Sequence, residues 1–425
     1  MTTKAVDDLV AKGQGARAAG RLLARLSTHV KNRALLNIAE ALEADHAAVL
    51  AANQKDYHAA QSDGLSEALL DRLLLTPERL QGIAQDVRGV AALPDPVGVT
   101  EDMTTLPNGL LVGKRRVPLG IIGSIYESRP NVTVDISALC IKSGNACLLR
   151  GGKESLRSNS ALVELIHKSL SQAGLPREAV QFIDNPDRAL IDVMLGMKDY
   201  IDLIIPRGGP GLIQLVAEQA TMPAVTGGIG VCHTYVDRAA DVEKASNIIF
   251  NAKVQRPTVC NALDTVLVHS DVAPKCLPGF ARQLSMAGVE LHCDQRALSV
   301  LGPNSGINAL PASEDDWGKE FLSLTAAVKV VDSLDEALKH IEVYGSGHSE
   351  AIVTEDYSAA MRFLEEVDAA AVYVNASTRF TDGAQLGLGA EVGISTQKFH
   401  ARGPMGLREL TSYKWVIMGN GQIRE

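Results

Sequence analysis

Aromatic residues are scarce in this chain of 425 residues, at 4% of the composition, although 46% of it is hydrophobic. The interior must therefore be built from Ala, Val, Leu and Ile, which favours α/β layers of aliphatic strands under amphipathic helices. No apolar run approaches the ~20 residues that span a bilayer. The start, MTTKAVDDLVAKG, lacks the apolar core of a signal peptide, so a cytoplasmic protein without membrane contact is expected.

Basic charge is also in short supply, because 41 Lys and Arg stand against 50 Asp and Glu, leaving a formal net charge of -9. Nucleic-acid binding needs a concentrated basic surface and is therefore disfavoured. The six cysteines include no CxxC pair and the ten histidines no HExxH motif. Neither a redox dithiol nor a metal site is expected.

The pattern of apolar residues predicts helices over the first ninety or so positions. Asn108-Gly109, between apolar and basic residues, predicts a β-hairpin, and a last β-like stretch is expected around Asn420-Gly421. Beyond Pro118 strands and helices alternate, which predicts two doubly wound, parallel-sheet α/β domains. The expected strands lie at residues 120–126, 146–150, 201–206, 264–269, 326–331, 350–354 and 370–375, and two short strands separated by glycines are expected within 224–237.

Cys260 stands in the most informative stretch, NAKVQRPTVCNALDT, where a predicted helix ends and a strand begins. A thiol at such a junction can project into a cleft, and Arg256 or local N–H groups would favour its thiolate. A thiolate attacks an acyl carbon to form a thioester, which divides one difficult reaction into two easier steps. From these residues alone, a buried structural cysteine stays open as the alternative.

Two glycine pairs, Gly151-Gly152 and Gly208-Gly209, each follow a predicted strand and precede a helix. The amino ends of helices attract anions, and Arg150, Lys153 and Arg207 would add positive charge. This arrangement suits the phosphates of a nucleotide, although the GxGxxG fingerprint is missing. Ordinary turn glycines are the alternative.

Asn131, in ESRPNVT, has an amide that can stabilise an oxyanion, unless it only serves the turn beside Pro130. His348 and His400 lie in glycine-rich loops, where each either contacts substrate or has a structural role. The polar, glycine-rich segment that follows Arg379 is typical of an active-site lid or wall.

Eight stretches match one family in order along the chain: PLGIIGSIYESRPNVT, KSGNACLLRGGKE, IIPRGG, TGGIGVCHTYVD, NAKVQRPTVCN, GSGHSEAIVT, VYVNASTRFTDG and GLGAEVGISTQKFHARGPMGL. On these residues the chain resembles the γ-glutamyl phosphate reductases, or glutamate-5-semialdehyde dehydrogenases, of the aldehyde dehydrogenase superfamily. The resemblance implies NADPH-dependent reduction of L-glutamyl 5-phosphate to L-glutamate 5-semialdehyde in proline biosynthesis, with release of phosphate.

The resemblance also implies a domain organisation. A cofactor-binding domain would cover residues 1–232, a catalytic domain 233–367, and a returning glycine-rich segment 368–409. Residues 105–117 and 410–425 would form a β arm that pairs with a partner subunit, so a homo-oligomer is expected. The acyl phosphate would come from a separate kinase, and no residue here supports or opposes transient contact with it.

For the site, the resemblance implies that Cys260 is the nucleophile and that Asn131 and the Cys260 N–H hold the oxyanion. Arg129, Arg256 and Arg379 become candidates for the substrate's phosphate and α-carboxylate. Arg150 and Lys153 become candidates for the 2′-phosphate of NADP(H). The other residues expected at the cofactor are Gly152, Arg207, Gly208, Gly209, Thr226, Gly227 and Gly228.

One departure from the superfamily pattern separates the alternatives. Hydrolytic members carry a glutamate before the paired glycines, as a base for the deacylating water, whereas here Thr226 precedes Gly227-Gly228. This favours acyl-phosphate chemistry over a hydrolytic aldehyde dehydrogenase, whereas a CoA-linked aldehyde dehydrogenase stays open as the alternative. A non-catalytic binding protein is disfavoured because Cys260, Asn131 and the glycine turns are all present.

Overall fold

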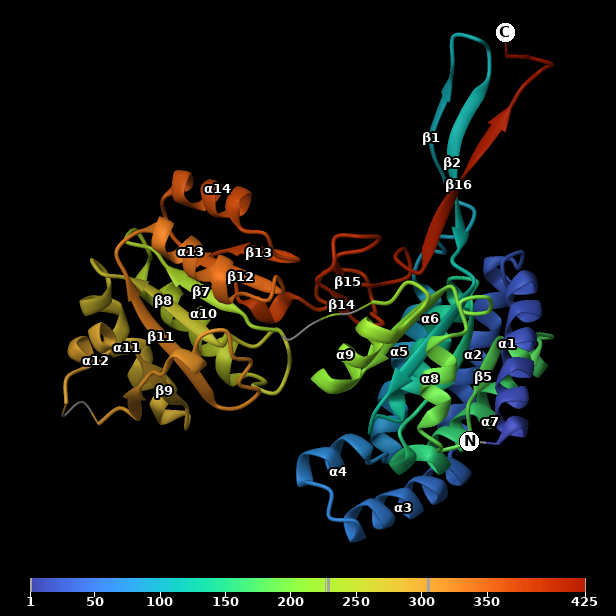
Figure 1. The fold of residues 1–425 in the computed structure, drawn as a ribbon, viewed down its shortest axis with the longest axis horizontal. Helices are drawn as coiled ribbons and strands as arrows, with labels where there is room; N and C mark the ends of the chain where they lie inside the picture. Colours follow the sequence, from blue (N-terminus) through green and yellow to red (C-terminus); the bar gives the residue numbers. More distant parts are fainter. Residues whose placement is uncertain (1, 226, 228–229, 304–305, 425) are drawn as a thin grey trace. The chain divides into compact units, whose positions relative to one another are not determined.

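The computed structural model describes residues 2–225, 227, 230–303 and 306–424 (Figure 1). The chain forms two compact units. The first comprises Met1–Thr226, Gly387–Gly393 and Met405–Glu425, and the second comprises Gly227–Leu386 and Ile394–Pro404. The functional roles given to residues 1–232, 233–367 and 368–409 stay predictions.

A four-stranded parallel sheet forms the centre of the first unit, in the order β5-β4-β3-β6. Its strands are Val180–Phe182 (β5), Ala146–Arg150 (β4), Ile121–Tyr126 (β3) and Leu203–Arg207 (β6). All six residues of β3 are buried, which explains why its sequence is a continuous apolar run rather than an alternation. The three strands expected in this part of the chain are therefore confirmed.

Helices surround this sheet. Residues of α1 (Thr3–Leu23) and α8 (Ala189–Leu195) share one apolar cluster with β3 and β4. Outside that cluster, α6 (Asn131–Lys142) and α7 (Leu156–Gln172) contact the same sheet. The first ninety residues are helical as predicted, and the remaining helices of the unit are α2 (Thr28–Ala44), α3 (Ala47–Ser62), α4 (Glu67–Leu73), α5 (Pro77–Ala92) and α9 (Pro210–Gln219).

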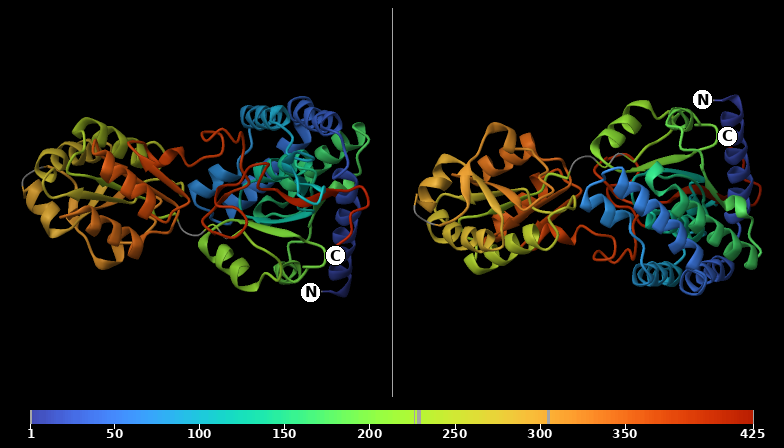
Figure 2. Two further views of the ribbon diagram at one scale, coloured as in Figure 1. Left: turned by 90° about the horizontal axis from the view of Figure 1, so that it is seen from above. Right: turned by 90° about the horizontal axis from the view of Figure 1, so that it is seen from below.

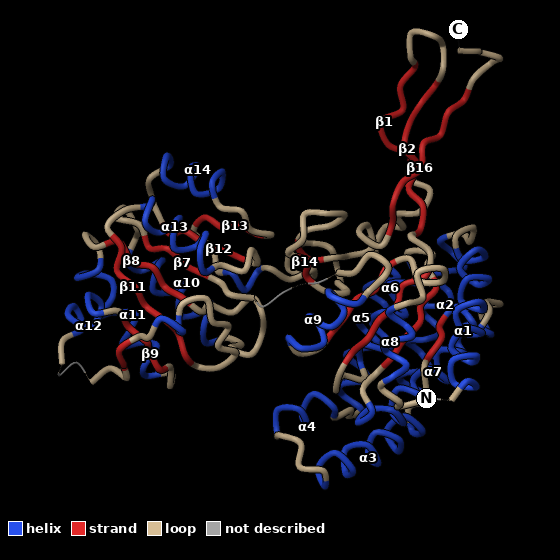
Figure 3. The backbone as a smooth tube through the Cα atoms, in the orientation of Figure 1, coloured by secondary structure: helices blue, strands red, loops and turns tan. Residues whose placement is uncertain are grey.

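A separate antiparallel sheet projects from the first unit (Figures 1 and 3). Its strands are β1 (Thr100–Thr105), β2 (Leu111–Pro118) and β16 (Thr411–Met418), with β2 in the middle. The predicted hairpin turn is present: Gly109 has a φ of 83°, and Asn108 Oδ1 accepts from Leu110 N at 3.1 Å. The strand expected around Asn420-Gly421 is wrong in position, because β16 ends before that pair.

The second unit is built on a seven-stranded parallel sheet, in the order β10-β9-β11-β8-β7-β12-β13. The strands are His233–Val236 (β7), Thr265–His269 (β8), Glu290–Cys293 (β9), Ala309–Pro311 (β10), Thr325–Val331 (β11), Ser349–Val353 (β12) and Ala371–Val374 (β13).

Two apolar clusters join this sheet to its helices, which lie on both of its faces (Figure 2). One cluster includes residues of α10, α11 and α12, and the other includes residues of α13 and α14. This arrangement confirms the doubly wound α/β prediction. The helices are Val242–Val254 (α10), Ala273–Met286 (α11), Gln295–Leu301 (α12), Leu334–Tyr344 (α13) and Tyr357–Glu366 (α14).

Short elements complete the chain. In the glycine-rich segment, β14 (Ile394–Ser395) pairs antiparallel with β15 (Gly403–Pro404). The 3₁₀ turns are Lys153–Ser155 (η1), Arg177–Ala179 (η2), Glu314–Asp316 (η3) and Thr378–Phe380 (η4). Over the described residues, every helix is too short or too polar to cross a bilayer.

Candidate active site

Cys260 differs from the other cysteines in its access to solvent. It lies in the loop between α10 and β8 and is half-buried, whereas the other five, all within the described residues, are buried. Burial raises the pKa of Cys276 to about 11 and that of Cys293 to about 12, so these thiols stay protonated near neutral pH. Cys260 is thus the most solvent-accessible of the six thiols.

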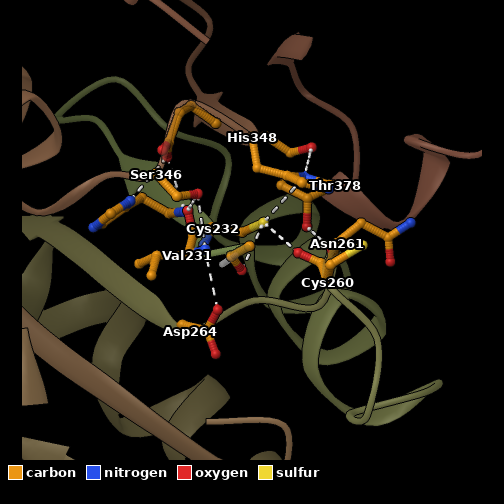
Figure 4. A network of polar contacts seen from close by, with 12 residues as sticks. Val231, Cys232, Cys260, Asn261, Asp264, Ser346, His348 and Thr378 are labelled. Carbon is orange, nitrogen blue, oxygen red and sulfur yellow. Dashed lines mark hydrogen bonds and ion pairs between the residues drawn. The ribbon is translucent and has the colours of Figure 1, made fainter. Parts of the chain in front are cut away.

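The loop that carries Cys260 is anchored to the segment that begins at η4 (Figure 4). Asn261 Nδ2 donates to Thr381 O at 2.8 Å, and Thr378 Oγ1 donates to Asn261 O at 2.8 Å. These bonds tie the residue next to the thiol to a segment 120 positions further along the chain. A nucleophile held from both sides keeps its position when substrate binds.

Gly230 and Cys232 contact Cys260 directly, and Cys232 is seen beside it in Figure 4. Cys232 Sγ donates to Cys260 O at 3.2 Å. Gly230 lies so close that a Cβ on it would collide with both the oxygen and the Cβ of Cys260. Sequence reasoning missed these contacts, because nothing local marks residue 230 or 232 as a neighbour of residue 260.

The buried carboxylate of Asp264 links the backbone of Cys232 to Phe321 and Lys253. Its Oδ2 accepts from Cys232 N at 3.3 Å and its Oδ1 from Phe321 N at 3.0 Å, while Lys253 Nζ lies 3.8 Å from Oδ1. Burial raises the pKa of Asp264 to about 6, and the charge of Lys253 opposes that rise. Either charge alone would be costly to bury, so the two depend on each other.

Two arginines predicted for the substrate belong to the same unit as Cys260. Burial lowers the pKa of Arg379, the charge of Arg256 lowers it further, and Cys260 acts in the opposite direction. Asn261 Nδ2 donates to Arg379 O at 3.4 Å, so Arg379 lies beside the loop that carries Cys260. Arg379 Nε is also held by Gln255 Oε1 at 2.9 Å. Neighbouring guanidinium groups suit a doubly anionic substrate.

His348 lies close to this cluster but does not suit acid catalysis. Its Nδ1 is 2.8 Å from Ser349 Oγ and 3.9 Å from Cys232 Sγ. Burial lowers the pKa of His348 to about 4, so the ring is neutral near pH 7. Of the two roles left open by the sequence, the structural one fits better. His400 lies in an exposed loop with a φ of 74°.

The predicted oxyanion donor lies in the first unit. Asn131 is the first residue of α6, and its Nδ2 donates to Asp135 Oδ2 at 2.9 Å. Arg129, two residues earlier, is half-buried in the same unit. The candidate substrate residues are therefore divided between the units, with Asn131 and Arg129 in one and the Cys260 cluster in the other.

The two cations predicted to bind a 2′-phosphate differ in their exposure and in their hydrogen bonds. Arg150 ends β4, and its guanidinium donates to Gly151 O at 2.7 Å and to Pro186 O at 3.1 Å. The side chain is buried, and burial lowers its pKa. Lys153, in η1, is exposed. Lys153 is therefore the cation that a bound phosphate can meet, whereas Arg150 is already committed to main-chain carbonyls.

The amino end of α9, where a cofactor phosphate was predicted, already carries a carboxylate. Glu127 Oε2 accepts from Gly209 N at 2.9 Å, and a Cβ on Gly208 would collide with the same carboxyl group. Arg207 is half-buried directly before this turn. The glycine pair thus gives room to Glu127, which any incoming phosphate would have to replace.

Two of the remaining glycines predicted at the cofactor lie so close to neighbouring groups that they leave no room for a side chain. A Cβ on Gly152 would collide with the Glu154 carboxyl group, and one on Gly227 would collide with Ile394 O. Thr226 and Gly228 lie outside the described residues. Within the described residues, no three His, Cys, Asp or Glu side chains are grouped in a way that suits a metal ion.

Comparison with known proteins identifies relatives along the whole chain. The profile of the aldehyde dehydrogenase family matches residues 1–303. A gamma-glutamyl phosphate reductase of Dehalococcoides mccartyi is 60% identical over 421 residues, covering 99% of both chains. The gamma-glutamyl phosphate reductase of Salmonella dublin is 55% identical over 412 residues, which covers 97% of this chain and 99% of that protein.

Solved structures of other proteins also match this chain over almost its whole length. The crystal structure of gamma-glutamyl phosphate reductase from Thermotoga maritima is 47% identical, with a TM-score of 0.95 over 98% of this chain and 100% of that one. An acetylating aldehyde dehydrogenase from Geobacillus thermoglucosidasius, at 17% identity, has a TM-score of 0.70 over 99% and 98% of the two chains. The latter shares the fold, which confirms the aldehyde-dehydrogenase-like architecture predicted from the sequence.

Proposed function

Because the chain belongs to the gamma-glutamyl phosphate reductases of the aldehyde dehydrogenase family, we propose that it reduces L-glutamyl 5-phosphate to L-glutamate 5-semialdehyde. It is an oxidoreductase of proline biosynthesis that uses a nicotinamide cofactor and a small-molecule substrate. The observation that carries the proposal is the half-buried Cys260, on a loop that Asn261 anchors to Arg379, whose side chain in turn contacts Gln255 next to Arg256. A nucleophile next to two cations matches an electrophile that carries a phosphate.

In the first step the Cys260 thiolate attacks the γ-carbonyl carbon of the acyl phosphate and forms a C–S bond. The carbonyl oxygen becomes an oxyanion, which the Asn131 amide and the Cys260 N–H stabilise by hydrogen bonds. The C–O bond to phosphate then breaks, and inorganic phosphate leaves with the electron pair. Arg256 and Arg379 neutralise its charge as it departs, which leaves a γ-glutamyl thioester on Cys260.

When bound, the nicotinamide cofactor supplies the hydride that reduces this thioester. The same two donors, Asn131 and the Cys260 N–H, again hold the negative oxygen that forms on the carbon. That oxygen's electrons re-form the carbonyl as the C–S bond breaks. Cys260 leaves as a thiolate, ready for the next turnover, and the product is the semialdehyde.

We further propose that the cofactor is NADP(H). The carboxyl ends of β3, β4 and β6 meet at one edge of the first unit's sheet, which is where parallel sheets bind nucleotides. Lys153 follows β4 at this edge and is exposed, so its ammonium group fits a 2′-phosphate. Residues 207–209 follow β6 at the same edge and would meet the diphosphate.

The projecting sheet supports the proposal of a homo-oligomer. Four apolar residues of β16 are each at least half exposed: Tyr413, Trp415, Ile417 and Met418. A thin, three-stranded sheet with exposed apolar side chains gains stability when a second copy covers it. We propose that this arm pairs with a partner subunit.

The reaction is tested in reverse, by measuring NADP⁺ reduction with glutamate 5-semialdehyde in the presence and absence of inorganic phosphate. We expect turnover to depend strictly on phosphate, because phosphate must release the acyl group from Cys260. Turnover without phosphate would instead indicate a hydrolytic dehydrogenase and overturn the proposal.

The role of Cys260 is tested by Cys260→Ala, which should abolish turnover while NADPH still binds. Cys276→Ala is the matched control, because this thiol is buried in an apolar cluster on α11, and it should retain activity. Substantial activity in Cys260→Ala would rule out the thioester mechanism.

A further inference from the structure

Asn131 and Asp135 lie one turn apart on α6, with their side chains joined. Asn131 Nδ2 donates to Asp135 Oδ2 at 2.9 Å. Residues four apart on a helix share a face, so the backbone itself keeps this pair together. Asp135 is half-buried where α5 packs against α6. Two charged groups from neighbouring elements act on it, Asp86 on α5 and Arg207 at the end of β6.

An asparagine amide has two distinct ends, and only one suits an oxyanion. The NH₂ group can donate two hydrogen bonds, whereas the oxygen can only accept. Rotation of the amide by half a turn would present its oxygen to the developing negative charge and turn stabilisation into repulsion. Something must therefore hold the NH₂ end toward the reacting carbonyl.

An ionised carboxylate holds an amide in this way, because it accepts hydrogen bonds and donates none. With Asp135 charged, the nitrogen of Asn131 must face it, and one of the two N–H groups is then used. The second N–H, on the same nitrogen, is left to donate elsewhere. A hydrogen bond to a charged acceptor is also stronger than one between neutral groups, which favours this orientation further.

We propose that Asp135 is a positioning residue, whose carboxylate orients the Asn131 amide so that its second N–H meets the substrate's oxyanion. The inference rests on the proposed function, since it assigns Asp135 a role only through Asn131. Asp135 itself does not touch the substrate.

The orientation depends on the charge of Asp135. Burial raises the pKa of Asp135 to about 7; the hydrogen bond from Asn131 opposes the rise, the charge of Asp86 adds to it, and that of Arg207 opposes it. Below that pKa the carboxyl group is protonated and can donate to the Asn131 oxygen, which turns the amide the wrong way. Activity should therefore fall on the acid side.

The test compares the pH profile of the wild type with that of Asp135→Asn in the reverse reaction. An asparagine at 135 does not titrate, and its NH₂ group can donate to the Asn131 oxygen as a protonated carboxyl can, so kcat should be lower than in the wild type at alkaline pH. We expect kcat of the wild type, divided by kcat of the variant, to be constant and above one at alkaline pH and to fall toward one as the pH drops through the pKa of Asp135. Ionisation of the substrates and of Cys260 affects both proteins equally and cancels in this ratio. The KM for NADP⁺ should not change.

Two further variants distinguish positioning from a structural role. Asp86→Asn removes a like charge from an exposed position on α5, so it should shift the acid limb to lower pH without harming the fold. In an Asn131→Ala background, Asp135→Asn should cause no additional loss of kcat, because the amide that it orients is gone.

Any of three results would overturn the inference. These are a kcat ratio that does not change with pH, an acid limb that is not shifted in Asp86→Asn, and losses of kcat that add in the double variant. Strict phosphate dependence and the loss of activity in Cys260→Ala would then still support the proposed function. Full activity in Asn131→Ala would overturn the inference together with the oxyanion role of Asn131. Asp86→Asn decides the question even if Asp135→Asn does not fold.

Discussion

The carboxylate of Glu127 occupies the amino end of α9, where its Oε2 accepts from Gly209 N at 2.9 Å. This is one of the two places where sequence and fold predict the phosphates of the cofactor. Two anions cannot share the same N–H groups, so Glu127 and the cofactor should compete for them.

Glu127→Gln should therefore strengthen NADPH binding. Glutamine keeps an oxygen acceptor for Gly209 N but removes a charge that repels phosphate, and charges at helix ends are worth about 0.3–1 kcal/mol, so we expect a roughly two- to fivefold lower Kd. Titration of NADPH fluorescence measures this. Glu218→Gln, an exposed residue near the other end of α9, is the control. Weaker binding in Glu127→Gln would mean that Glu127 is a cofactor ligand and not a competitor.

Lys153→Met should change the choice of cofactor. The variant loses the exposed cation proposed for the 2′-phosphate, and a hydrogen bond to a charged group contributes about 1.5–3 kcal/mol, so the Kd for NADPH should rise by roughly tenfold or more. Binding of NADH, which has no 2′-phosphate, should stay the same. Lys168→Met, at an exposed position of α7, should change neither. An equal loss for both cofactors would show that Lys153 does not recognise the 2′-phosphate.

Gly230→Ala should impair catalysis rather than folding. The added Cβ would collide with the oxygen and the Cβ of Cys260 and push the nucleophile out of place. A displacement of about 1 Å at a reacting group can cost roughly 100-fold in kcat. Gly279→Ala in α11, where nothing lies within 4 Å of the added carbon, should keep normal kcat. Normal kcat in Gly230→Ala would show that the loop yields without consequence.

Asp264→Asn should destabilise the second unit. The Asp264 carboxylate accepts from Cys232 N and Phe321 N through different oxygens, and a buried donor that loses its acceptor costs about 1–3 kcal/mol. The substituted NH₂ group would also face a backbone N–H that needs an acceptor. Thermal melting of the purified protein at neutral pH measures the change. An unaltered melting temperature would show that the hydrogen bonds of the Asp264 carboxylate do not stabilise the second unit.

The pH dependence of stability offers a separate check on Asp264. Its folded pKa, about 6, lies above the usual 3.8, so the folded state binds the proton more tightly than the unfolded one. The stability that this group contributes is therefore complete below about pH 4 and is lost as the pH rises toward 6. Asp264→Asn should lack this component, which appears as a difference between the two melting profiles.

Elements with a strong local pattern could be predicted from the sequence. The apolar run of β3 and the Asn108-Gly109 turn specify their own conformations, and both are found where expected. The three-residue strand β5 and the strand β9 were missed, because a stretch that short has no readable period. The C-terminal strand was placed too late, since its turn residues are easier to recognise than its polar-apolar alternation.

The site could be predicted only as far as single residues reveal their chemistry. Cys260 was found because a helix-loop-strand junction and a family resemblance both point to it. Its neighbours Cys232 and Gly230 were not found, because a contact across 28 positions leaves no mark on either sequence segment. Arg150 shows the opposite case: its charge suggested a phosphate, but only coordinates reveal that its guanidinium is bound to two carbonyls.

The middle strand of the projecting arm has a consequence for how the protein is made. β2 pairs with β16, and Arg116 Nη1 reaches Thr411 Oγ1 across 295 positions of chain. At about 5–20 residues per second, a ribosome needs roughly 15–60 s to add that length after β2 has emerged. Throughout this interval one edge of β2 has no partner from its own chain. We therefore expect nascent chains stalled before residue 411 to aggregate or recruit chaperones more readily than completed ones.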